Sequence, residues 1–337
     1  MKLVRLLPLF TLVAVALILG QSSKDTFRVP LGLTPILWPK DNPYSADKAH
    51  LGRLLYYDKR LSADNSVACA SCHAPDKGFT DQLPVSVGIR GQKGGMSAPT
   101  VINRGYGMLQ FWDGRAGSLE AQAIGPIANP IEMGHSHDGV VRNLQQIAGY
   151  RQLFKASFGT EEVTIDRVAK AIATFERTVV SGNAPYDKYR AGNKNALSAA
   201  QVRGLNVYFN KAKCDSCHEG PNFTANSFHN LGVGSQKANP DAGRFAVTKN
   251  PADWGAFKTP TLREIPHTAP YMHDGSLATL EEVVDFYDKG GIKNKNLDET
   301  MKPLNLSAQE KKDLVEFLKA LSGEGWQHLT APKSFPQ

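Results

Sequence analysis

The chain has little of what marks several large classes of protein. Only four of its 337 residues are cysteine, and 21% are charged. No run of lysine and arginine is interleaved with aromatic residues, so nucleic-acid binding is not expected despite a formal net charge of +7. The hydrophobic content of 41% suits a globular protein. Patterns that alternate between polar and apolar residues are almost absent, which favours a mostly helical fold.

One long apolar run stands at the start of the chain, and it has the order of a secretory signal peptide. Lys2 and Arg5 lead into the apolar stretch 6–19, and small residues that suit a cleavage site follow it. An uncleaved membrane anchor is the less favoured alternative, because the stretch is short for a full span. We therefore expect residues 1–22 to be removed and the mature protein to be periplasmic.

The four cysteines lie in two copies of one motif, CASCH and CDSCH. In CxxCH the two thiols attach haem covalently, and the adjacent histidine binds its iron. A zinc ribbon needs its CxxC pairs about 15–20 residues apart, and a thioredoxin-type site needs only one pair. These pairs lie in different halves of the chain, and each carries a histidine. Two covalently bound haem c groups are thus predicted, with these attachment residues and iron ligands: Cys69, Cys72, His73, Cys214, Cys217 and His218.

The sequence before each motif repeats as well. Ser45 can cap a helix ahead of the first motif, and Ser198 with Gln201 forms a capping box ahead of the second. Each half then reads as a helix, a loop and a haem motif. We expect two cytochrome c-like domains packed together, covering residues 23–190 and 191–337.

Further amphipathic helices are predicted at 164–180 and 307–321. Long segments rich in glycine, proline and asparagine, such as 84–107 and 219–260, are expected to be loops wrapped around the cofactors. The predicted fold class is mostly α, with long connecting loops.

Beyond the two motifs, the chain resembles the bacterial dihaem cytochrome c peroxidases and their relative MauG. The resemblance spans nearly the whole mature chain and rests on CASCHAPDKGFTD (69–81), APTVINRGY (98–106), QFWDGRAGSLEAQAIGPIANPIEMG (110–134), FKTPTLREI (257–265) and APYMHDGS (269–276). It implies an oxidoreductase in which hydrogen peroxide reacts at the N-terminal haem and the C-terminal haem transfers electrons.

The resemblance also implies that the first haem is open at rest. In conventional members of the family a loop histidine covers this iron until the enzyme is reduced. Ile89 stands at that place here, in the stretch 86–94, and isoleucine cannot bind iron. The neighbouring Arg90 either approaches a haem propionate or is solvated.

Three further residues match functional positions of the family. Glu132 matches its catalytic glutamate, and Gln122 matches the glutamine beside it. A carboxylate above the haem can move a proton between the two oxygens of the peroxide. Trp112 matches a tryptophan between the two haems, although core packing is the usual role of a buried tryptophan. His135 and His137 are expected at the surface.

Tyr287 matches the position of the sixth ligand to the second iron. Conventional members carry methionine there, fourteen residues after the histidine of the PYxHxG motif, which is His273 in this chain. MauG-like members carry tyrosine. A hard phenolate ligand lowers the haem potential and suits the storage of the second oxidising equivalent. Met272 and Met301 are alternative ligands, and a buried core tyrosine is the plain alternative for Tyr287 itself.

The resemblance further implies a calcium ion between the domains. Thr268 and Pro270 match its carbonyl donors, whereas Ser97, a weaker donor, replaces the family's asparagine.

The leading functional hypothesis is a periplasmic, MauG-like dihaem peroxidase that takes hydrogen peroxide and oxidises a protein or small donor. The first alternative is a conventional cytochrome c peroxidase, supplied with electrons by a small cytochrome c or a cupredoxin. The second alternative is a dihaem electron carrier without enzymatic activity. The resemblance allows either a monomer or a homodimer.

Overall fold

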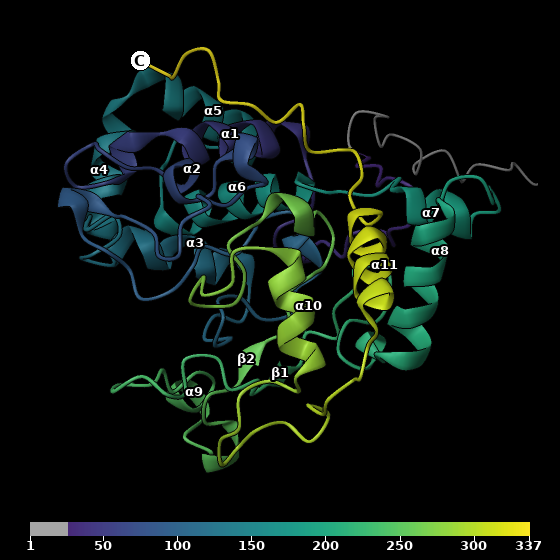
Figure 1. The fold of residues 1–337 in the computed structure, drawn as a ribbon. Helices are drawn as coiled ribbons and strands as arrows, with labels where there is room; N and C mark the ends of the chain where they lie inside the picture. Colours follow the sequence, from purple (N-terminus) through teal and green to yellow (C-terminus); the bar gives the residue numbers. More distant parts are fainter. Residues whose placement is uncertain (1–25) are drawn as a thin grey trace, which may run out of the picture.

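The computed structural model describes residues 26–337, so the predicted signal peptide lies outside the described residues. The described part of the chain is mostly helical, which confirms the predicted fold class (Figure 1). Its two strands, β1 (Phe228–His229) and β2 (Phe257–Lys258), form a small antiparallel sheet. No helix from residue 26 onward is long and apolar enough to cross a membrane.

Eleven α-helices are assigned within residues 26–337. Those of the first half are α1 (Ala46–Tyr57), α2 (Cys69–Cys72), α3 (Leu119–Ala128), α4 (His137–Gln146), α5 (Ala148–Phe158), α6 (Ile165–Thr178) and α7 (Pro185–Arg190). Those of the second half are α8 (Ala199–Asn206), α9 (Phe245–Thr248), α10 (Leu280–Asp288) and α11 (Ala308–Lys319), and a π-helical turn, Val207–Lys211, continues α8.

In the first half, α1 packs against α6. The Ser45 hydroxyl accepts a hydrogen bond from the Lys48 amide, as expected of the predicted cap. At the crossing, a Cβ atom on Gly52 would lie 1.9 Å from the Ala171 carbonyl oxygen, so only glycine permits this approach. The predicted helix at 164–180 is α6.

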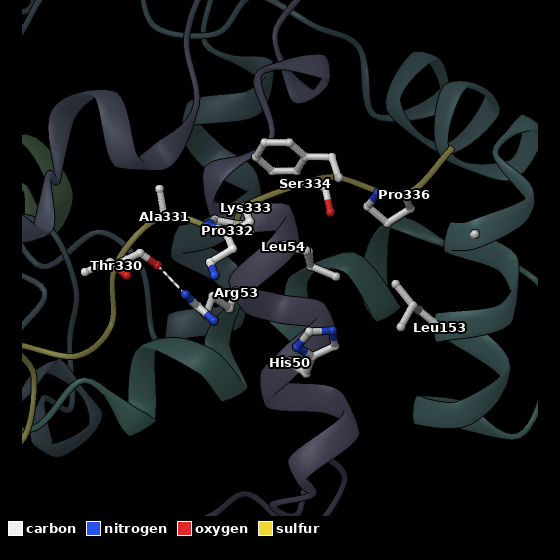
Figure 2. A pocket seen from close by; sticks show the side chains of 12 residues that line it. His50, Arg53, Leu54, Leu153, Thr330, Ala331, Pro332, Lys333, Ser334 and Pro336 are labelled. Atoms are coloured by element: carbon white, nitrogen blue, oxygen red, sulfur yellow. Dashed lines mark hydrogen bonds between the residues drawn. The ribbon is translucent and has the colours of Figure 1, made fainter.

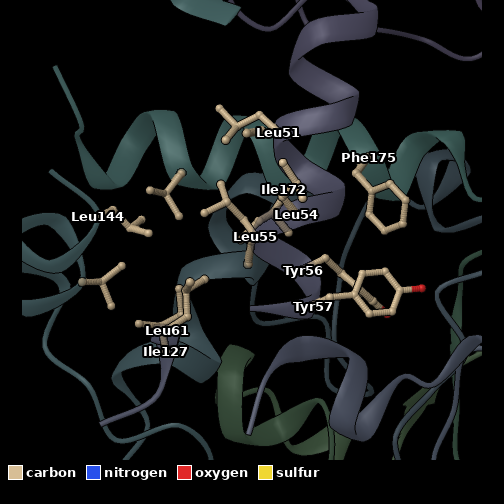
Figure 3. Packing of buried hydrophobic residues seen from close by; sticks show 14 of the residues in the cluster. Leu51, Leu54, Leu55, Tyr56, Tyr57, Leu61, Ile127, Leu144, Ile172 and Phe175 are labelled. Atoms are coloured by element: carbon tan, nitrogen blue, oxygen red, sulfur yellow. The ribbon is translucent and has the colours of Figure 1, made fainter. Parts of the chain in front are cut away.

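The first hydrophobic core lies between these two helices (Figure 3). Leu51 and Leu55 of α1 are fully buried and face Ile172 of α6, with Phe175 one turn further on. Each such aliphatic side chain contributes about 1.5–3 kcal/mol on burial. The apolar stripe of α1 thereby fixes the position of the chain that leads into the first CxxCH motif.

The second core repeats this arrangement with α8 and α11. A Cβ atom on Gly204 of α8 would lie 1.9 Å from the Asp313 carbonyl oxygen of α11. Gly52 of α1 makes the equivalent close approach to α6. Tyr208 and Phe317 are fully buried there with ring centroids 5.1 Å apart. The capping box predicted at Ser198 is present, and α11 begins with a further capping box at Ser307.

The C-terminal segment 322–337 runs back from α11 across the first half of the molecule, as the yellow trace in Figure 1 shows. Trp326 belongs to the first hydrophobic core, although it follows the last helix of the second half. The Tyr57 hydroxyl donates to the Leu329 carbonyl at 2.6 Å. The domain boundary predicted between residues 190 and 191 stays a prediction. The C-terminal segment contacts residues from both predicted domains: Trp326 packs in the first core, and the Gly323 amide donates to Glu264.

Candidate haem sites

The first CxxCH motif borders a cavity of about 440 Å³. The short helix α2 carries Cys69 and Cys72, whose thiols are free, and His73 follows it directly. All three side chains line the cavity together with Glu132 and Gln122. The structure thus brings the predicted attachment residues and the predicted acid/base residues to one site.

The side chains at this cavity fit a haem. Burial lowers the pKa of His73, so its imidazole is neutral and can offer a lone pair to iron. Its Nδ1 is buried and has no hydrogen-bond partner in the described part of the chain. The Tyr56 hydroxyl holds the main chain here by donating to the His73 carbonyl at 2.8 Å.

The second CxxCH motif also has a neutral histidine whose main-chain carbonyl accepts from a buried tyrosine. The Nδ1 of His218 lies 3.1 Å from the Phe223 carbonyl oxygen, which can only accept, so Nδ1 carries the hydrogen and Nε2 keeps its lone pair. Burial lowers the pKa of His218 to about 4, so the ring is neutral. The Tyr208 hydroxyl donates to the His218 carbonyl at 2.5 Å, as Tyr56 does to His73. The thiols of Cys214 and Cys217 are free here too.

Tyr287 lies beside the second motif. Its helix, α10, begins with a capping box formed by Thr279 and Glu282. Burial raises the pKa of Tyr287, and the nearby Cys214 and Cys217 thiols raise it further. Met272, an alternative ligand from the sequence, lines the first cavity instead. The phenol of Tyr287 is thus close to the second pair of thiols, where an axial ligand would be needed.

The two halves also match in the segment that leads into α3 and α10. A β-bridge joins Gln110 to Ala116 in the first half, and a corresponding bridge joins Tyr271 to Leu277 in the second. The next residues, Phe111 and Met272, both have positive φ, at 66° and 72°. Ser118 then caps α3 as Thr279 caps α10.

In this register, Pro126 of α3 occupies the place of Tyr287 of α10. Pro126 lines the first cavity, and its ring cannot bind iron. Sequence reasoning missed Pro126, although the similarity of QFWDGRAGSLE and YMHDGSLATLE could have revealed the correspondence. The same alignment pairs Trp112 with His273.

Glu132 lies in a turn, and hydrogen bonds fix both its side chain and its main chain. Its Oε1 accepts a hydrogen bond from the Asn129 side chain at 2.9 Å, and its main-chain carbonyl accepts one from the Ile89 amide at 2.8 Å. Burial raises the pKa of the Glu132 carboxyl, against the effects of Arg115 and Asn129. The half-buried carboxyl is therefore kept closer to neutrality than a solvated one.

The loop that would carry a covering histidine is fixed against this turn. Ile89 is 2% exposed and packs against Gly134, where an added Cβ atom would lie 2.4 Å from the Ile89 Cδ1. Its side chain is not part of the cavity wall, whereas the thioethers of Met96 and Met133 are. Arg90 is exposed, which favours the solvated alternative for it.

Trp112 links segments of the two halves. Its indole Nε1–H donates to the Ser97 carbonyl at 2.8 Å, and the Ser97 amide donates to the His273 carbonyl at 2.8 Å. Its own carbonyl accepts from the Lys258 amide at 2.8 Å. The indole also lines the first cavity, so its place fits both packing and a path between the sites.

The residues predicted for calcium border the same cavity: Ser97, Thr268 and Pro270. Within residues 26–337, no three His, Cys, Asp or Glu side chains gather as a metal site. Calcium would have to bind mainly to carbonyl oxygens and stays a prediction. His135 and His137 are half-buried rather than fully exposed, and His137 Nε2 lies 2.9 Å from the Ile124 carbonyl.

Sequence reasoning missed three buried ionisable residues in the wall of the first cavity: Arg104, Glu176 and Lys258. Arg104 and Lys258 lie in segments that carry the family resemblance, which was the available signal.

A second cavity, of about 630 Å³, lies away from both motifs, between α1, α5 and the C-terminal segment (Figure 2). Arg53 donates to the Thr330 carbonyl at 2.5 Å across it. Its wall includes His50 and Lys333 but no residue of a haem motif. This groove is therefore not the redox site.

Comparison with known proteins identifies the family. The model of the family described as di-haem cytochrome c peroxidase matches residues 46–195. Methylamine utilization protein MauG of Methylorubrum extorquens is 45% identical, over 85% of this chain and 81% of its own. Cytochrome c551 peroxidase of Nitrosomonas europaea is 43% identical, over 84% and 82%.

A solved structure agrees with these relatives. The crystal structure of a MauG-like protein associated with microbial copper homeostasis matches with a TM-score of 0.83 and 36% identity, and the match covers 90% of this chain and 97% of that one. Two CxxCH motifs, two matching helical cores and these relatives lead to one conclusion. The chain is an oxidoreductase that belongs to the di-haem cytochrome c peroxidase family, with two haem cofactors and hydrogen peroxide as substrate.

Proposed function

We propose that hydrogen peroxide reacts at the first cavity without prior reduction of the protein, and that His218 and Tyr287 both bind the second iron. One observation carries the proposal: the matching position in the two halves holds Pro126 at the first cavity and Tyr287 at the second motif. The other source of a covering ligand, position 89, holds isoleucine with its side chain turned into the protein.

The cysteines of each motif hold the haem covalently, and His73 and His218 supply its proximal ligands. Bound haem provides a redox-active iron at each site that exchanges electrons with peroxide or with a donor. The free thiols and the neutral imidazoles support this assignment. A phenol must lose its proton to bind a metal, so Tyr287 would bind as phenolate once the iron is present.

Glu132 moves the proton that the cleavage of peroxide requires. Asn129 fixes its Oε1, which leaves Oε2 to take a proton from one peroxide oxygen and deliver it to the other, so that water can leave. Gln122, in the same wall, orients the substrate by hydrogen bonding. Trp112 provides an aromatic bridge between the two sites.

Calcium bound by Ser97, Thr268 and Pro270 would stiffen this junction. The predicted signal peptide supports a periplasmic location. The electron donor is a small cytochrome c, a cupredoxin or an oxidisable protein.

The proposal is tested by adding stoichiometric hydrogen peroxide to the fully oxidised protein and following the optical spectrum. We expect rapid changes at both haems without any reductant. Glu132→Gln should slow the reaction about 10²- to 10⁴-fold, as expected for loss of a general acid/base group. Glu299→Gln, at an exposed glutamate, is the matched control and should leave the rate unchanged.

Other outcomes point to the alternatives. Reaction only after one electron is supplied would indicate a conventional, reductively activated peroxidase. A low-spin first haem in the electron paramagnetic resonance spectrum would then show a hidden ligand, for which Met96, Met133 and Met272 of the cavity wall are candidates. If peroxide changes the spectrum of neither haem under any condition, the remaining hypothesis is a dihaem electron carrier without enzymatic activity.

The tyrosine ligand has its own test. Tyr287→Met should raise the midpoint potential of the second haem, because a soft thioether replaces a hard phenolate. Phe286→Met, at the adjacent residue of α10, changes the packing without changing a proposed ligand and should leave the potential in place. Equal potentials in wild type and Tyr287→Met would show that Tyr287 is a core residue.

A further inference from the structure

We propose that Lys258 and Arg104 form the anion-binding end of the first cavity and take the two propionate carboxylates of its haem. The second half of the chain would then supply part of the site of the N-terminal haem. This inference rests on the proposed haem binding in that cavity, and it concerns residues for which the proposed function gives no role.

Lys258 is a buried amine without a hydrogen-bond or ion-pair partner for its side chain in the described part of the chain. It lies on β2, its side chain lines the first cavity, and only 5% of the residue is exposed. Its main-chain amide is bonded to Trp112, but its Nζ has no hydrogen-bond or ion-pair partner among residues 26–337. Burial lowers the pKa of Lys258, and the positive charge of Arg104 lowers it further. A buried ammonium is costly unless an anion accompanies it.

Arg104 lies near Lys258 and is bonded only to neutral groups. Its Nε and Nη2 donate to Gln110 Oε1 at 3.0 and 2.8 Å, and Nη2 also donates to the Leu109 carbonyl at 2.9 Å. Its Nη1 has no partner in the described part of the chain. The residue is 8% exposed, and burial lowers the pKa of Arg104 to about 10. These bonds hold the guanidinium in place, and none of them is to a carboxylate.

No acidic residue of the cavity wall forms an ion pair with Lys258 or Arg104 within residues 26–337. Burial raises the pKa of Glu176 to about 8, against the effects of Arg177 and Arg104, so this carboxyl is mostly neutral at pH 7. Glu132 accepts from the Asn129 side chain and Asp241 from the Gly243 amide at 2.8 Å, and neither carboxyl is paired with Lys258 or Arg104 in the described part of the chain.

The other arginine of the wall is already neutralised. Arg115 is paired with Asp113 at 3.0 Å. Lys258 and Arg104 therefore face one cavity, and neither has an ion-pair partner within residues 26–337.

A ligand with two carboxylates would give both Lys258 and Arg104 an ion-pair partner. Haem carries two carboxylates, and the same wall holds the thiols of Cys69 and Cys72 and the imidazole of His73, which suit its attachment. An arginine fork matches a carboxylate with two donors, whereas a lysine meets one as a point charge. Lys258 would then pair with a propionate of the first haem through its side chain while its main-chain amide donates to the Trp112 carbonyl.

The test uses the haem-loaded protein and three measurements: covalently bound haem per chain, the midpoint potential of each haem, and the propionate bands in the resonance Raman spectrum. Lys258→Met should lower the potential of the first haem, because loss of a nearby positive charge favours the oxidised iron. It should shift the first haem's propionate band and leave the second haem unchanged.

Lys48→Met is the matched control. Lys48 is equally buried, but its Nζ already donates to Asn42 Oδ1 at 2.8 Å and to the Pro43 carbonyl, away from the cavity. This variant should change neither potential nor propionate band. A loaded Lys258→Met protein whose potential and band match the wild type would overturn the inference.

A charge-preserving variant keeps the test valid if Lys258→Met does not accumulate. Lys258→Arg retains the positive charge and rearranges its donors, so the propionate band should shift while the potential stays near that of the wild type. An unshifted band in this variant would also overturn the inference. Wild-type protein with fewer than two haems would instead overturn the proposed function on which the inference rests.

Discussion

At the scale of single residues, the two halves of the molecule differ where chemistry requires it. Both halves place a turn with positive φ, a capped helix and a residue at the same point of that helix beside a CxxCH motif. That residue is Pro126 in one half and Tyr287 in the other. The two halves are otherwise similar. In the first, α3 offers no iron ligand at this position, whereas in the second, α10 offers the phenol of Tyr287.

We predict that Pro126→Met closes the first site. A thioether at this point of α3 would have the position that methionine has in the second half of conventional family members, so it should bind the first iron. The first haem should become low-spin. The rate of its reaction with peroxide should fall at least about tenfold, because the bound thioether would block peroxide from the iron. Electron paramagnetic resonance and stopped-flow absorbance would check this.

Pro130→Met, at an exposed proline beyond the end of α3, is the control and should keep the wild-type spectrum. A first haem that remains high-spin in Pro126→Met would show that the helical register of α3 and α10 does not carry over to the two irons.

At the scale of elements, the pairs α1 with α6 and α8 with α11 are the supports of the two motifs. Capping boxes and apolar spacing predicted these helices and their starts correctly, because both signals depend on residues within one or two turns. The closeness of each pair depends on Gly52 and Gly204, which only the packed structure reveals.

Gly204→Ala should destabilise the second half even though alanine favours helices. The added Cβ would lie 1.9 Å from the Asp313 carbonyl oxygen, so α8 and α11 must move apart. We expect a loss of about 1–3 kcal/mol, as for other overpacked cores, measured by denaturant unfolding. Gly125→Ala on α3 is the control, because its Cβ would meet the Phe111 ring at an ordinary 3.5 Å. Equal stability of both variants would contradict the close crossing.

The junction of α8 and α11 should also depend on pH. Lys211, on the π-helical turn, donates to Glu310 of α11 at 2.7 Å, and together with Ser307 it lowers the pKa of Glu310 to about 2 from the usual 4.5. Because the folded pKa is depressed, the stabilisation is present above pH 4.5 and is lost as the pH falls towards 2.

The free energy of unfolding of wild type and Glu310→Gln, measured between pH 7 and pH 3, should therefore converge on the acidic side. A difference that is the same at every pH would show that the bond to Lys211 does not depend on the charge of Glu310.

At the scale of the whole molecule, the C-terminal segment ties the last helix to the first haem motif. Trp326 packs edge-on against Phe79, with ring centroids 6.2 Å apart, and Phe79 follows His73 in the first motif segment. Arg60 donates to the Pro336 carbonyl at 3.1 Å further along. The second half of the sequence thus completes the core of the first.

Trp326→Ala should cost about 3–5 kcal/mol, the usual range for removing a buried large aromatic side chain. Trp254→Ala is the control, since Trp254 is 41% exposed and should cost far less. Denaturant unfolding of the two variants would measure the difference. Similar small losses in both would mean that the C-terminal segment does not contribute to the first core.

The sequence by itself determined the fold class, the family and the two haem motifs, because attachment of haem requires cysteines and histidine that are adjacent in the chain. It also determined where the capped helices begin. The roles of Glu132, Trp112 and Tyr287 remain predictions, and the structure places each of them beside the expected motif or cavity.

Only the tertiary structure brought Lys258, Arg104 and Glu176 into one cavity wall, matched Pro126 with Tyr287, and returned Trp326 to the first core. The physical reason is that burial and charge balance belong to groups that meet after folding. A lysine in the sequence is ordinarily solvated, and its lack of a partner becomes visible only when segments from both halves close around it.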